Sequence, residues 1–145
     1  MQGAETLVLL LIKLLLGLMS LGAAVEVETV AGPVRFTDLY GSPREAVAAS
    51  GCMDGASKIW LSDEGASFEV LLHELAHAYD CADNGEIDGS PGGQAEHRPA
   101  WASDYCWDSP AERYACAVTE TGQLRPFSPR LQPPRLARIR PVSAR

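Results

Sequence analysis

The stretch from Ser67 to Cys81, SFEVLLHELAHAYDC, limits this chain to folds built around one well-packed helix. On a helix of 3.6 residues per turn, its large apolar side chains fall at i, i+3, i+4, i+7 and i+11, which is one continuous stripe. Ser67 is suited to cap the first turn. We therefore predict a helix over residues 67–81. Its core stripe consists of Phe68, Leu71, Leu72, Leu75 and Tyr79.

A second face of the same predicted helix carries His73 and His77 one turn apart, and Glu74 lies one residue round from His73. Two neutral imidazoles at this spacing can bind one Zn²⁺ at about 2.0–2.1 Å. Glu74 would then lie close to the ion without binding it, where a general base can take a proton from a zinc-activated water. A lone histidine is usually an ordinary core or surface residue. Packing alone, however, gives no reason for this pair with a glutamate after its first member.

The sequence His73-Glu74-Leu75-Ala76-His77 matches the HExxH pattern, and the segment from Lys58 to Asp80 resembles the zincin metallopeptidase superfamily. The resemblance implies a zinc metalloendopeptidase that hydrolyses peptide bonds, with His73 and His77 as metal ligands and Glu74 as general base. It also implies that KIWLS, residues 58–62, is the edge strand along which an extended peptide or protein substrate lies.

A catalytic zinc ion commonly has three protein ligands and one water, so the motif helix needs a third ligand from elsewhere. Glu112 is preferred, because AERYACAV resembles the second helix of gluzincin-like enzymes. Glu112 is also the N3 residue of a capping box that begins at Ser109, and that role alone would explain it. Asp83 occupies the position of the third metzincin ligand, but Asp80 replaces the glycine of that pattern. Asp83 and Asp80 therefore remain as alternatives to Glu112.

Residues 82–108 are polar and rich in glycine, and they predict a long loop of the kind that is usually functional or mobile. Tyr105 in this loop is a candidate donor to the oxyanion that forms when water attacks a carbonyl. His97 is a weaker candidate, because a solvated histidine explains it better.

The remaining elements predict a small α+β domain with a short antiparallel or mixed sheet, an active-site helix and a second, ligand-bearing helix. Strands are expected at 25–30 and 58–62, with VRFTDL as the partner of the first. Helices are expected over 42–51, where Ser42, Pro43 and Glu45 form a capping signature, and over 109–122. The domain is expected to span 25–122.

Residues 1–24 form an apolar segment interrupted by Glu5 and Lys13. Such a segment can cross a bilayer or serve as a signal peptide cleaved after Ala24. We predict an exported protein, secreted or associated with a membrane through this segment, with a buried core helix as the alternative.

The four cysteines favour two disulfides in an oxidising compartment, because they are even in number and lack the CxxC spacing of a four-cysteine zinc site. Three pairings are possible, and pairing Cys81 with Cys106 is the one that would close the base of the long loop.

The charge of the chain is divided between an acidic body and a basic end. All 19 acidic residues precede residue 122, whereas six of the 12 basic residues follow it. An acidic body argues against nucleic acid as a partner. The proline- and arginine-rich residues 123–145 are expected to be disordered.

Two other functions fit parts of the pattern. A non-catalytic binding module could keep a zincin-like fold and a structural metal, but it has no need of the base Glu74. A cytosolic regulatory protease that cuts a repressor would share SPAERYA, although the apolar N-terminus and the four cysteines argue against that compartment. The preferred prediction is a small exported zinc metallopeptidase.

Overall fold

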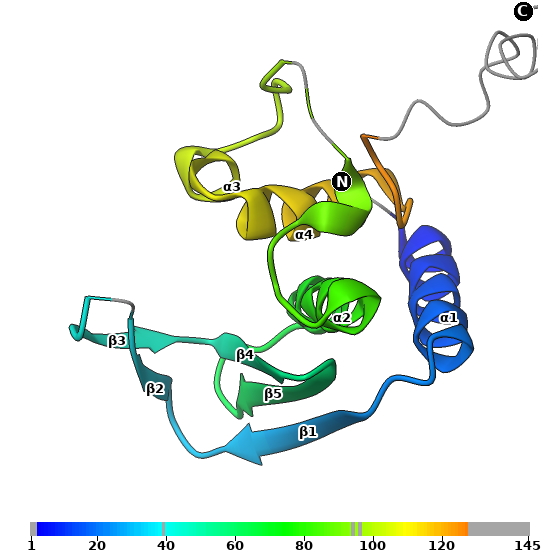
Figure 1. Ribbon diagram of the computed structural model, residues 1–145. Coiled ribbons are helices and arrows are strands. Elements are labelled where there is room, and N and C mark those ends of the chain that lie inside the picture. The colour runs from blue at the N-terminus through cyan, green and yellow to red at the C-terminus, as the bar shows by residue number, and fades with distance from the viewer. Residues whose placement is uncertain (1–2, 39, 94, 96, 128–145) are drawn as a thin grey trace, which may run out of the picture.

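The computed structural model describes residues 3–38, 40–93, 95 and 97–127. It is a small α+β fold, as the sequence predicted. The helix α2, Phe68–Asn84, lies at the centre of the molecule. The strands β4 and β5 pack on one side of it and the helix α4, Pro110–Thr121, on the other (Figure 1).

The main sheet has three strands in the order β1-β5-β4. The strand β1, Val25–Val30, runs parallel to β5, Ala56–Ser62, and β4, Ala48–Met53, runs antiparallel to β5. A separate two-stranded ribbon pairs β2, Val34–Thr37, with β3, Pro43–Ala46. The strands predicted at 25–30 and 58–62 are therefore confirmed.

Three details of the predicted sheet are wrong. Residues 42–51 contain β3 and the first part of β4 and not a helix, and residues 34–37 of VRFTDL pair with β3 and not with the first strand. KIWLS lies in the central strand, so the edge strands are β1 and β4. Asp54 and Gly55 explain the first error: with φ of 53° and 83° they form the two-residue turn of a hairpin. That turn folds residues 48–53 back onto β5, and strand pairing overrides the local capping signature.

The first segment forms α1, Ala4–Ser20, which packs against α2 and contributes to the core. Leu10, Leu14 and Leu18 are buried along one stripe. Gly17 allows close approach, because a Cβ atom there would lie 2.8 Å from the ring of Tyr79. This stripe of α1 therefore packs as a core helix does, which was the alternative prediction for the first segment. Within the described part of the chain, no helix has both the length and the apolar character needed to span a membrane.

Two disulfides link neighbouring elements. Cys52–Cys81 joins β4 to α2, and Cys106–Cys116 joins the short helix α3, Asp104–Asp108, to α4. The predicted pairing of Cys81 with Cys106 is wrong, because β4 lies along α2 whereas α3 and α4 follow each other directly in the chain. Two disulfides indicate an oxidising environment.

The chain passes beside α1 where α4 ends. Gly122 terminates α4 in the left-handed conformation, with φ of 72°, and its carbonyl accepts a hydrogen bond of 2.9 Å from Lys13 Nζ. Of the segment that was expected to be disordered, residues 128–145 lie outside the described residues.

Candidate metal centre

The helix α2 begins and ends as its sequence predicts. The Ser67 side chain accepts a hydrogen bond of 3.2 Å from the Val70 N–H, and Gly85 ends the helix with φ of 90°. Leu72, Leu75 and Tyr79 of the predicted core stripe are buried, whereas Phe68 at the first turn is exposed. The apolar stripe thus fixes the rotation of the helix and turns its histidine face away from the main core.

Glu112 takes part in the cap of its own helix and also reaches the two histidines of α2. Its backbone N–H donates to the Ser109 hydroxyl at 3.2 Å, which caps α4. Its carboxylate extends to the two histidines of α2. The close packing of α4 on α2 makes this reach possible, because small buried residues such as Ala76 and Ala115 lie on the two helices. The cap and the candidate ligand are therefore different atoms of one residue.

The three predicted ligands converge in space. Glu112 Oε1 lies 2.8 Å from His73 Nε2, and Glu112 Oε2 lies 3.2 Å from His77 Nε2. The two imidazole rings are 4.9 Å apart between centroids and are inclined at 83°. One ligand atom from each residue lies within 4.8 Å of the others, so His73, His77 and Glu112 form a group that could hold a metal ion.

The geometry and charge of this group fit a small divalent cation. Ligand atoms about 2.0–2.1 Å from a tetrahedral ion are about 3.3 Å apart. The contact between Glu112 and His77 already has that length, and the shorter contact with His73 would need to open slightly. Two imidazoles and one carboxylate are also the ligand types that zinc sites use.

The charges of the group also favour a cation. Burial raises the pKa of Glu112, but the hydrogen bonds from His73 and His77 outweigh burial and hold that pKa well below its usual range. Burial lowers the pKa of His77, but the Glu112 carboxylate reverses the effect and raises it overall. The carboxylate thus stays ionised and attracts positive charge to the space between the rings.

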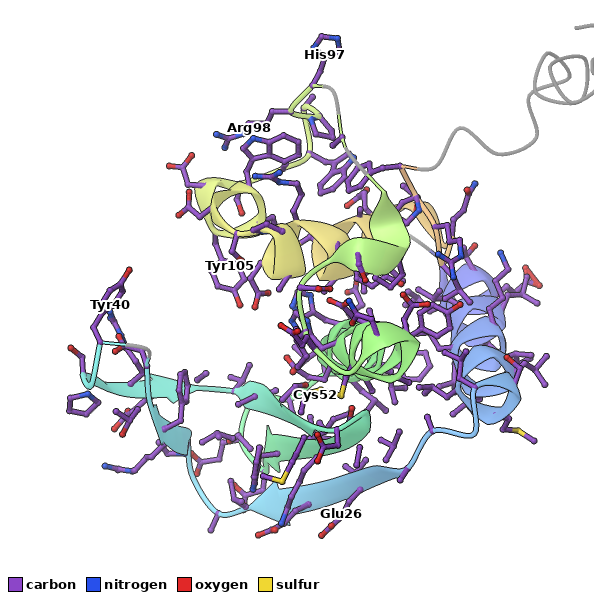
Figure 2. The ribbon with its side chains drawn as sticks, in the orientation of Figure 1. Glu26, Tyr40, Cys52, His97, Arg98 and Tyr105 are labelled. Atoms are coloured by element: carbon purple, nitrogen blue, oxygen red, sulfur yellow. A yellow bond between two sulfur atoms is a disulfide. The ribbon has the colours of Figure 1, made fainter. Side chains whose placement is uncertain are left out.

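The other acidic and histidine candidates lie elsewhere. Asp83 accepts a hydrogen bond of 3.3 Å from the Ser90 hydroxyl, and Asp80 accepts one of 2.6 Å from the Gly89 N–H. Burial raises the pKa of Asp80 to about 6. His97 is exposed at the far end of its loop and points away from α2 (Figure 2). Among the described residues, Glu112 is the acidic residue that joins the two histidines in a metal-binding group.

Glu74 is buried beside the histidines and contacts a residue that the sequence did not reveal. Its Oε1 atom accepts a hydrogen bond of 2.5 Å from the Ser50 hydroxyl on β4. Because residues 42–51 were expected to form a helix, Ser50 gave no sign of facing α2. The Asp54-Gly55 turn is the signal that could have revealed it.

A cleft of about 850 Å³ opens over these side chains. The β2–β3 ribbon and β4 form one wall, and α3 contributes Tyr105 from the opposite side (Figure 2). Burial, together with the charge of Glu112, raises the pKa of Tyr105, so its hydroxyl stays protonated and can donate. The cleft is lined by two of the three candidate ligands, His77 and Glu112, and also by Ser50, Glu74 and Tyr105.

Comparison with known proteins gives no relative: no family model, no curated protein and no solved structure matches the chain.

Proposed function

We propose that this protein is an exported zinc metallopeptidase of the zincin type. The observation that carries the proposal is the convergence of His73, His77 and Glu112 beside a cleft that His77, Glu112 and Glu74 line. The metal-binding face of α2 and the capped helix α4 supply this arrangement from segments that are 35 residues or more apart in the sequence. A binding module with a structural metal would need the three ligands but not the buried carboxylate of Glu74.

In this proposal His73, His77 and Glu112 hold the zinc ion, which when bound supplies a Lewis acid that polarises the scissile carbonyl and acidifies a water. Glu74 accepts a proton from the attacking water and later delivers it to the leaving amine nitrogen. The water oxygen forms a bond to the carbonyl carbon, and the C–N bond breaks. Tyr105 donates a hydrogen bond to the oxyanion that develops on the carbonyl oxygen.

The edge of β4 would hold the substrate in extended form. Ser62 N donates to Val47 O, and the antiparallel register then turns the backbone groups of Ala49 and Gly51 toward β5. The N–H and C=O groups of Ala48, Ser50 and Cys52 face the opposite, outer side. A peptide that pairs with these groups would pass beside Glu74, because the Ser50 side chain contacts that carboxylate.

Two measurements test the proposal: cleavage of a peptide library, detected by mass spectrometry, and the number of zinc ions bound per chain. The wild type should bind one zinc ion per chain and cleave peptides, and a chelator should abolish cleavage. Glu74→Gln should keep the ion and lose hydrolysis. Glu69→Gln, in the first turn of the same helix, is the matched control and should behave as wild type. Hydrolysis that persists in Glu74→Gln would contradict the mechanism.

A metal-binding test separates the candidate third ligands. Glu112→Ala should lose zinc, whereas Asp83→Ala and Asp80→Asn should retain it, because their carboxylates bond to Ser90 and Gly89. Loss of zinc in Asp83→Ala alone would overturn the assignment of Glu112.

A further inference from the structure

Ser50 connects the sheet to the proposed catalytic base. It lies in the middle of β4, and its hydroxyl crosses to α2 to donate to Glu74 Oε1 at 2.5 Å. Hydrogen bonds of this length to a carboxylate are among the strong ones in proteins. Within the described part of the chain, Ser50 is the hydrogen-bond partner of the Glu74 carboxylate, and Oε2 has none.

The orientation of the Glu74 side chain depends on this contact. A glutamate has three rotatable side-chain torsions, and the last of them is broad, so packing of the methylene groups alone does not fix the carboxylate. The Ser50 hydroxyl holds one oxygen on the side of β4. Glu74 lines the cleft together with His77 and Glu112, and its second oxygen accepts no hydrogen bond from the described residues.

The backbone of Ser50 faces the outer edge of the sheet, where an extended peptide would pair. Ser50 therefore touches two parts of the proposed machinery: its backbone borders the substrate path, and its side chain holds the base. A shift of β4 relative to α2 would move both together. The disulfide between Cys52 and Cys81 joins the same two elements two residues further along β4.

We propose that Ser50 is a positioning residue that orients the Glu74 carboxylate for proton transfer. This inference rests on the proposed hydrolytic function. Proton transfer requires the base and the reacting water to lie within hydrogen-bond distance, so a carboxylate that is free to rotate spends less time in the reactive orientation. The role is separate from metal binding, because the Ser50 hydroxyl donates to Glu74, which is not one of the three candidate ligands.

Steady-state kinetics on a peptide that the wild type cleaves provide the test. Ser50→Ala should lower kcat by about 10- to 100-fold, as expected for loss of a hydrogen bond to a charged group, with KM and zinc content unchanged. Ser57→Ala is the matched control, because Ser57 is a buried serine on the adjacent strand whose hydroxyl has no partner among the described residues. That variant should keep the wild-type kcat.

A second pair of variants keeps the test valid if Ser50→Ala folds poorly. Ser50→Thr and Ser50→Val are nearly equal in size, and both are favoured in strands, but only threonine keeps the hydroxyl. Threonine should restore most of kcat and valine should not. Equal kcat values for the two variants, or a loss of zinc in Ser50→Ala, would overturn the positioning role.

The two proposals fail in different ways. A wild-type protein without chelator-sensitive cleavage, or with cleavage equal to that of Glu74→Gln, contradicts the metallopeptidase function itself. Cleavage that requires Glu74 but is unaffected in Ser50→Ala leaves the function standing and refutes the role of Ser50.

Discussion

Removal of the disulfide between Cys52 and Cys81 should destabilise this protein more than removal of the one between Cys106 and Cys116. The first pair closes a loop with a sequence separation of 29, and the second a loop with a separation of 10. In the chain-entropy model, loops of these lengths correspond to about 3.6 and about 2.7 kcal/mol at 25 °C. A difference of about 1 kcal/mol in the free energy of unfolding is therefore expected between the two double-alanine variants.

Urea unfolding under non-oxidising conditions measures both losses relative to the wild type with its disulfides intact. Cavity effects should be similar in the two variants, because Cys81 and Cys116 are both buried and each replacement removes the same atoms. The thermal midpoint should fall in the same order as the free energy. If removal of the shorter loop costs as much as removal of the longer one, or more, the reasoning from loop length is refuted for this fold.

Two further predictions concern single side chains. Tyr105→Phe should lower kcat by about 100-fold and leave the zinc content unchanged, because it removes a hydrogen-bond donor and none of the candidate ligands. An unchanged kcat would remove Tyr105 from the mechanism. The pKa of Asp80 is raised from 3.8 to about 6 on folding, so the folded state holds the proton longer than the unfolded state and stability falls as pH rises from about 4 to about 6. The expected fall in the free energy of unfolding is about 3 kcal/mol, and Asp80→Asn should remove it while keeping an acceptor for the Gly89 N–H. Urea unfolding of both proteins at pH 4 and pH 7 measures the change. An equal change in wild type and variant would contradict the prediction.

The parts of the site that lie on one helix could be predicted from the sequence. Helical periodicity fixes which residues share a face, so His73, His77 and Glu74 could be placed relative to one another and to the core stripe. The cap at Ser109 predicted where α4 begins, and the resemblance to gluzincins selected Glu112 from that helix. These inferences needed local information together with one family pattern.

The parts that depend on pairing between distant segments could not be predicted in the same way. The capping signature around Ser42 and the hairpin turn at Asp54-Gly55 favour different structures for residues 42–51, and local propensity alone does not decide between them. A helix over residues 42–51 gives no position for Ser50 against Glu74, because that contact depends on the strand β4. Cys52 likewise could not be placed opposite Cys81, so the choice among disulfide pairings had no geometric basis.

The covalent framework and the candidate site share the same elements. Cys52 lies two residues from Ser50, and Cys81 lies one turn beyond His77, so the first disulfide fixes the edge strand against the histidine helix. Cys106 is adjacent to Tyr105, and Cys116 lies one turn beyond Glu112, so the second disulfide fixes the cleft tyrosine relative to the candidate third ligand. A domain of this size has a limited core with which to hold four elements in register. The two disulfides hold these elements in register next to the residues of the proposed chemistry. Each bond lies within one helical turn, or within two strand residues, of a side chain of the candidate site.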